Sequence, residues 1–192
     1  MQLTINQRKL NTLAQYIGTR LITITTDDDR KFNRAYGNIS LELDKENLLI
    51  TNDYIDMSNV ANHVMLEEEI IYDLDFNNRT NNVFENDEVY TQEINSMITN
   101  IILIRDSISI YDKDGKSLDY VIVDEGLIFV LETKELLVSR LSDMTPMNTV
   151  IIDNNVITKL RTIEEVEKEW TDQESDDYHA KVTREIISLL KH

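Results

Sequence analysis

LDYVIVDEGLIFVLETK, residues 118–134, is the stretch that decides the predicted fold, because two apolar runs flank a single glycine. If the Glu-Gly pair ending at Gly126 forms a two-residue turn, with glycine where a positive φ is needed, the two runs pair as antiparallel strands. Asp119 then lies across from Glu132. Side chains alternate between the faces of a strand, so Lys134 shares the face of Glu132. The pattern predicts two carboxylates and a lysine on one hairpin.

Apolar side chains occupy both faces of the second predicted strand, residues 127–134, as in a strand that is covered on both sides. The first predicted strand, residues 117–124, is similarly apolar. Opposed carboxylates would repel each other there and would lose hydration, and a divalent cation would relieve both penalties. A Glu-x-Lys pattern on an exposed strand would instead indicate an ordinary solvated face.

The same stretch resembles the active-site hairpin of the PD-(D/E)XK nuclease superfamily, and most closely that of its nuclease-related domain (NERD) branch. The family pattern places Asp and an aromatic residue before three apolar residues, then a turn, more apolar residues and Glu-x-Lys, which this chain matches without a gap. Residues 100–117 and 149–170 resemble the flanking strands and helix, so the resemblance covers residues 85–170. The segment 135–148 departs from the family, because it leaves little room for the helix that follows the lysine there.

This resemblance implies a fold and a chemistry. The implied fold is α+β or α/β, with a mixed β-sheet flanked by helices in a restriction-endonuclease-like core. Asp119, Glu132 and the backbone carbonyl of Thr133 would bind Mg²⁺ or Mn²⁺, which prefer oxygen ligands. Lys134 would hold the attacking water or stabilise the transition state. The implied function is metal-dependent hydrolysis of nucleic acid, in the first instance DNA.

The N-terminal third reads as a helix followed by an antiparallel meander. Thr4 or Asn6 would cap a helix that stops at Gly18. Residues 21–26 alternate as a strand, and residues 38–52 read as a hairpin.

A polar run, residues 77–82, is the best linker, so two domains are expected, residues 1–78 and 79–192. Helical spacing of apolar residues predicts further helices over residues 85–98 and 174–190. The resemblance implies that Glu88 or Glu93, on the first of these, completes the metal shell.

Charge favours a different class of function. The chain has 36 acidic and 19 basic residues, a net charge of −17, whereas a nucleic-acid binder usually presents an excess of basic residues. Residues 67–69, with Asp73 and Asp75, form an acidic run that would suit a basic partner. The alternative hypothesis is therefore a non-catalytic acidic binding protein, an inhibitor or DNA mimic on a degenerate nuclease fold, that binds a basic protein.

Composition excludes several other classes. The chain has no cysteine, hence no disulfide or thiolate metal site, and its three histidines lack metal-ligand spacing. No apolar run approaches the length of a membrane span, so we expect no membrane association and a cytoplasmic protein. The sequence leaves the oligomeric state open.

Overall fold

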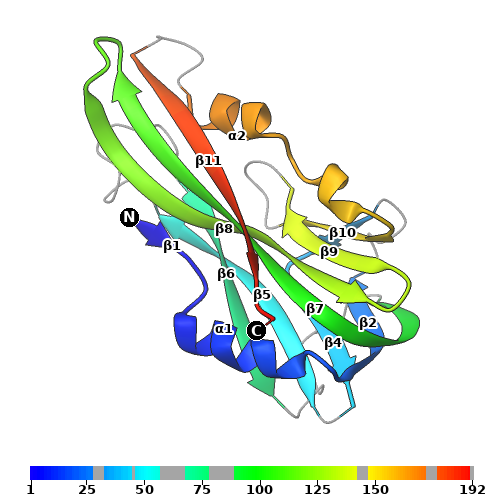
Figure 1. Cartoon of the computed structure of the whole chain (residues 1–192). Helices are drawn as coiled ribbons and strands as arrows, with labels where there is room; N and C mark the ends of the chain where they lie inside the picture. Colours follow the sequence, from blue (N-terminus) through cyan, green and yellow to red (C-terminus); the bar gives the residue numbers. More distant parts are fainter. Residues whose placement is uncertain are drawn as a thin grey trace.

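The computed structural model describes residues 1–27, 33–44, 46–56, 68–77, 89–141, 147–171 and 177–190 (Figure 1). The strands are β1 (Gln2–Leu3), β2 (Arg20–Asp27), β3 (Arg34–Tyr36), β4 (Ile39–Leu43), β5 (Asn47–Asp56), β6 (Glu68–Asn77), β7 (Val89–Asp112), β8 (Ser117–Leu131), β9 (Glu135–Arg140), β10 (Met147–Asp153) and β11 (Tyr178–Ser188). The helices are α1 (Gln7–Leu13), the 3₁₀ turn η1 (Ala14–Tyr16), the 3₁₀ turn η3 (Val156–Lys159) and α2 (Ile163–Glu169).

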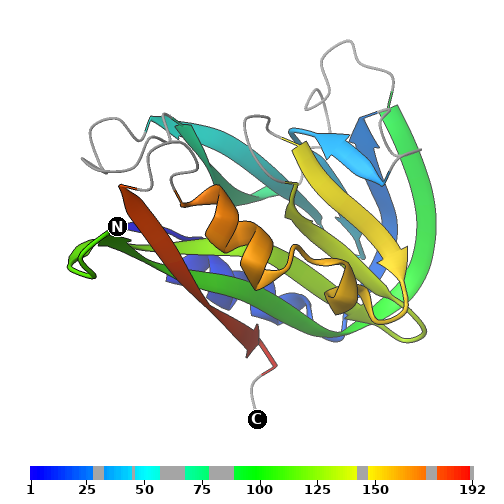
Figure 2. The same cartoon turned by 90° about the horizontal axis from the view of Figure 1, so that it is seen from above.

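The long strand β7 joins two sheets (Figures 1 and 2). Residues 98–112 of β7 belong to sheet A, where they pair with β8 on one edge and with β11 on the other, and β9, β10 and β3 follow β8 in order. Residues 89–97 of β7 pair with β2, which leads to β4, β5 and β6 in sheet B. All of these pairings are antiparallel, and β1 alone among the described strands pairs in parallel, with β8.

Three apolar clusters hold these layers together. The largest lies between the two sheets, includes Leu41, Leu74 and Phe129, and is joined by Leu10 and Leu13 of α1. On the other face of sheet A, a second cluster fixes α2 and β11 through the fully buried Trp170. A third lies under η3. Sheet A is therefore covered on both faces, which explains why β8 is apolar on both sides.

The predicted hairpin with its turn at Gly126 is wrong, because residues 117–131 form the single strand β8. The register pairs Gly126 with Ile104 and Asp124 with Arg105, so Glu125 is the extra residue of a β-bulge. A Cβ atom at Gly126 would lie 2.6 Å from the carbonyl oxygen of Val138 on β9. Glycine is needed there for close approach of two strands rather than for a turn.

The predicted fold class, a mixed sheet flanked by helices around a restriction-endonuclease-like core, is also wrong. The described chain is mainly antiparallel β-structure, and its two α-helices have seven residues each. Two helices predicted over residues 85–98 and 174–190 are the strands β7 and β11 where they are described. Residues 85–88, including Glu88, lie outside the described residues, and so do residues 78–82 of the predicted linker.

The reason for these errors is a shared periodicity. Ile94 and Ile98 in β7, and Tyr178 and Val182 in β11, are four residues apart. Four is close to one helical turn, but it is also twice the period of a strand. Buried positions alternate along both strands, and pairing with distant segments decides in favour of strands.

Other local predictions are confirmed. The side chain of Asn6 caps α1 by accepting a hydrogen bond from the Arg8 N–H, and the helical segment ends before Gly18, whose φ is +89°. The predicted strand 21–26 is β2, and the hairpin 38–52 is β4 with β5.

Strands from both sides of the predicted domain boundary share one sheet, since β2 pairs with β7.

Candidate functional site

The residues predicted to form a metal site lie at the two ends of β8. Asp119 is half-buried near the start of the strand, where it pairs with Ile110. Glu132, Thr133 and Lys134 are exposed in the turn between β8 and β9. At roughly 3.3 Å per residue, the stretch of strand between Asp119 and Glu132 is about 40 Å long. Their carboxylates do not fit one metal ion.

The turn residues have structural partners instead. Glu132 accepts hydrogen bonds through Oε2 from the Met97 N–H at 3.2 Å and from the Ser96 hydroxyl at 3.5 Å. The Lys134 carbonyl accepts one from the Leu131 N–H at 2.8 Å. Glu93 is exposed on β7, opposite Thr23 of β2. Over the described residues, no group of three or more His, Cys, Asp or Glu side chains is placed to hold a metal ion.

The charged groups that the structure buries next to one another lie in sheet A. Asp106 of β7 is fully buried and forms a bidentate ion pair with Arg184 of β11, at 2.8 and 2.7 Å. Burial raises the pKa of Asp106, because loss of water disfavours its charged form, and the Arg184 guanidinium opposes that effect.

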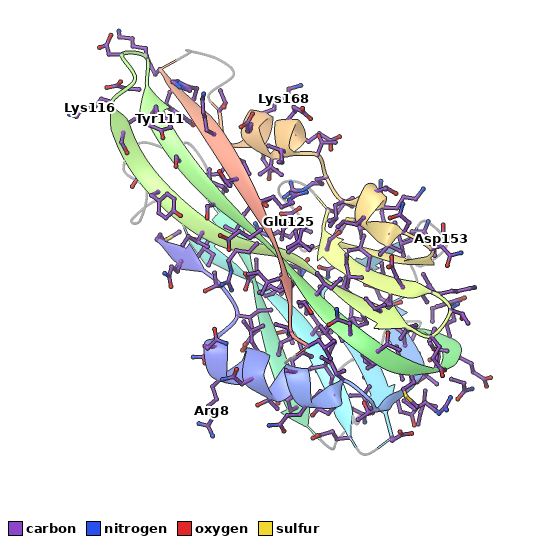
Figure 3. All side chains as sticks on the ribbon, in the orientation of Figure 1. Arg8, Tyr111, Lys116, Glu125, Asp153 and Lys168 are labelled. Carbon is purple, nitrogen blue, oxygen red and sulfur yellow. The ribbon has the colours of Figure 1, made fainter. Side chains whose placement is uncertain are left out.

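A second bidentate pair ties the central strand to the segment before α2. Glu125, the bulge residue of β8, accepts from Arg161 at 2.8 and 2.9 Å, and Figure 3 shows it in the middle of the molecule. Arg161 also pairs with Glu169 at the end of α2. Arg184 donates to the backbone carbonyl of Arg161 at 2.6 Å, which links the two pairs.

A third pair faces the core between the sheets. Asp124 of β8 accepts from Arg105 of β7 at 2.7 and 3.2 Å, and from the backbone N–H of Ile5 at 2.7 Å. Each buried carboxylate thus has its own guanidinium, which is the arrangement expected of buried charges with a structural role. The ion pairs hold α2, β11 and the N-terminal segment on sheet A.

The sequence analysis placed Asp124 at the end of the first predicted strand and Glu125 in the predicted turn, and it did not select Asp106 or Arg184. A signal for Asp106 was present, since it interrupts an alternating apolar run that contains Ile104, Ile108 and Ile110. A charged residue in such a run indicates a buried ion pair when a partner is available. Its partner is 78 positions away, so the sequence did not show it.

The surface next to these pairs combines a short acidic helix with an edge strand. α2 begins with a capping box, in which Thr162 and Glu165 satisfy each other's backbone N–H groups. The Thr162 backbone N–H, which donates to the Glu165 carboxylate, and then the Thr162 side chain hold the pKa of Glu165 below its usual value. The helix carries four glutamates, Glu164, Glu165, Glu167 and Glu169, against the single Lys168.

Comparisons with known proteins found no match to this chain. No protein-family model matches the chain, no curated protein is detectably similar to it, and no solved structure matches its fold. The comparisons therefore neither support nor oppose the resemblance to the nuclease superfamily. No helix in the described ranges has both the length and the apolar character needed to cross a lipid bilayer.

Proposed function

We propose that this chain is a non-catalytic acidic binding protein whose partner is a positively charged protein. The observation that carries the proposal is the pairing of the buried charges. Asp106, Asp124 and Glu125 are matched by three arginines, and Arg140 is buried as well. The described interior therefore holds no excess of negative charge.

The chain as a whole has a net charge of −17, and the buried charged residues that the structure describes account for none of this excess. A surface with such an excess attracts cationic partners over long distances and repels anionic ones, nucleic acid included. Attraction of this kind acts mainly on the association rate and selects partners by charge. A basic protein segment fits this surface better than a phosphodiester does.

The placement of the predicted catalytic residues favours binding over hydrolysis. The Glu132 side chain ties the turn between β8 and β9 to β7, the Lys134 backbone carbonyl closes that turn, and Asp119 lies at the far end of β8. We derive no reaction step through Mg²⁺ or Mn²⁺, because these residues do not converge. Metal-dependent cleavage of nucleic acid stays a prediction, and it can be tested separately.

The experiment is calorimetric titration of the full chain with a short lysine-rich peptide across a series of NaCl concentrations. We expect binding that weakens steeply as salt rises and that is the same with Mn²⁺ or with EDTA. A peptide with glutamate in place of lysine should not bind. No binding of the lysine-rich peptide at low salt would overturn the proposal, as would an affinity that salt leaves unchanged.

A further inference from the structure

Strand β11 forms an outer edge of sheet A, and only one half of that edge is covered by described residues. β11 pairs with β7 in unbroken register from Tyr178 to Ser188. In an antiparallel pair, residues alternate along each strand. One residue directs both its N–H and its C=O toward the paired strand, and the next directs both away from it. The Leu189 N–H points to β7, where it donates to the Ile101 carbonyl. Even-numbered residues of β11 therefore direct their N–H and C=O groups outward.

Side chains from the α2 region cover the first part of this outward edge. The Ala180 N–H donates to the Thr171 hydroxyl at 3.0 Å, and the Val182 N–H donates to Glu167 Oε1 at 3.0 Å. No described residue covers the outward N–H groups of Arg184, Ile186 and Ser188. The edge is thus closed by specific contacts up to Val182 and open beyond it, and an open edge is a template for another strand.

Apolar and polar groups flank the open part. Ile186 is 57% exposed, although it pairs with the buried Ile104, and Ile163 at the start of α2 is 39% exposed. The hydrogen bond from Arg184 to the Arg161 carbonyl holds the segment before α2 next to β11. Figures 1 and 2 show α2 running beside β11. An extended chain on this edge would therefore find backbone partners and an apolar contact together.

The charges of the chain indicate which kind of partner strand would pair with the open part of the β11 edge. The exposed Glu164 lies one residue beyond Ile163, and the exposed Glu185 lies beside Ile186. Glu169 of α2 pairs with Arg161, and Arg184 pairs with Asp106, so the negative charge beside the open edge comes from Glu164 and Glu185 and not from the whole of α2. A second copy of this chain would bring another net charge of −17 to the same edge, so repulsion opposes self-pairing.

We infer that an extended segment of a positively charged partner protein adds to sheet A as a strand along residues 184–188 of β11. This inference rests on the proposed function and specifies where and in which conformation the partner binds. Backbone hydrogen bonds would supply affinity, and the acidic flank would select lysine or arginine side chains, as is general for strand addition.

The test uses three peptides of equal length on the full chain. One alternates lysine with valine and favours an extended strand, one carries the same charge on an alanine-rich helix, and one alternates glutamate with valine. We expect the first to bind most tightly and to slow amide hydrogen exchange at Arg184, Ile186 and Ser188. A proline at an outward edge position removes a free donor without breaking the ladder. Ile186→Pro should therefore weaken binding of the first peptide at least about tenfold while the melting temperature is nearly kept.

Two matched variants separate the contributions. Ile186→Thr removes the exposed apolar side chain but keeps the N–H, so it should weaken binding less than Ile186→Pro does. Glu164→Gln with Glu185→Gln lowers the charge near the edge, whereas Asp75→Asn with Glu93→Gln lowers it equally on exposed positions of sheet B. The first pair should weaken binding more than the second.

Each outcome separates this inference from the proposed function. If the lysine-valine peptide binds the parent and Ile186→Pro equally, or protects other amides, docking at this edge is wrong while the acidic binder stands. If no lysine-containing peptide binds the parent, the proposed function fails as well. A parent dimer that becomes a monomer in Ile186→Pro would show that a second copy occupies the edge, and it would overturn the inference.

Discussion

The carboxylate of Glu167 on α2 accepts a hydrogen bond from the backbone N–H of Val182 on β11 at 3.0 Å. A helix side chain therefore takes the place of the backbone carbonyl that a neighbouring strand would offer to this N–H. This bond marks the end of the covered part of the β11 edge. Together with the bond from Ala180 to Thr171, it limits strand addition to the residues beyond Val182.

Replacing Glu167 should lengthen the open edge. We expect Glu167→Ala to lower the free energy of unfolding by about 1 kcal/mol, the net value of a typical hydrogen bond, and to tighten binding of the extended lysine-valine peptide. Thermal unfolding and calorimetric titration measure the two effects. Glu93→Ala removes the same charge from an exposed position of sheet B, away from the β11 edge, and serves as the control. If both variants behave alike, Glu167 does not cover the edge.

Gly126 allows a direct test of the strand against the predicted turn. In a turn that needs a positive φ, asparagine replaces glycine at little cost. In the structure, a Cβ at Gly126 meets the Val138 carbonyl at 2.6 Å, so Gly126→Asn and Gly126→Ala should each cost about 1–3 kcal/mol of stability. Gly115, with a φ of +80° and no atom within 4 Å of its Cβ position, should tolerate asparagine. Denaturant unfolding of the three variants distinguishes the two geometries.

The sequence predicted elements whose signals are local. The cap at Asn6, the stop at Gly18, strand β2 and the hairpin of β4 and β5 each depend on neighbouring residues, and each is found. The sheet as a whole depends on long-range pairing, which the sequence did not reveal.

The candidate site shows the same limit. Gly126 reads equally as a turn residue or as a point of close strand contact, and only the position of β9 decides between them. The edge of β11 was missed because residues spaced by four, such as Tyr178 and Val182, suit a helix as well as a strand. The two side chains that cover that edge, Glu167 in α2 and Thr171 just after it, belong to a separate segment.

The ion pair between Asp106 and Arg184 should couple β11 to the central strand. Asp106→Asn and Arg184→Met should each destabilise the protein by about 3–5 kcal/mol, because one buried charge is left without its partner. Replacing both with apolar residues of similar size should cost much less than the sum of the single changes. A double-mutant cycle measured by denaturant unfolding gives the coupling. Additive effects would show that the two side chains do not act as a pair.

Acid should weaken the cap of α2. The pKa of Glu165 lies below its ordinary value of 4.5 in the folded protein, since its carboxylate accepts the Thr162 N–H. A depressed pKa contributes stability that is present above the unfolded value and is lost as pH falls through the folded one. The melting temperature of the parent should therefore approach that of Glu165→Gln as the pH falls below 4.5 and through the lowered pKa of the folded protein. Glu164→Gln, which leaves Thr162 untouched, supplies the reference curve.

Metal and nuclease activity test the placement of Asp119 and Glu132. Because about 40 Å of β8 separates them, no ion can bridge their carboxylates. Any rise in melting temperature with Mn²⁺ should persist in Asp119→Asn and in Glu132→Gln. Lys134→Ala should leave unchanged any cleavage of single- or double-stranded nucleic acid at low salt, since this lysine lies beyond the end of β8 and Asp119 lies near its start. Loss of the Mn²⁺ effect in both carboxylate variants, together with cleavage that Lys134→Ala abolishes, would require these residues to converge. It would contradict both the β8 register and the non-catalytic function, and would restore the nuclease hypothesis.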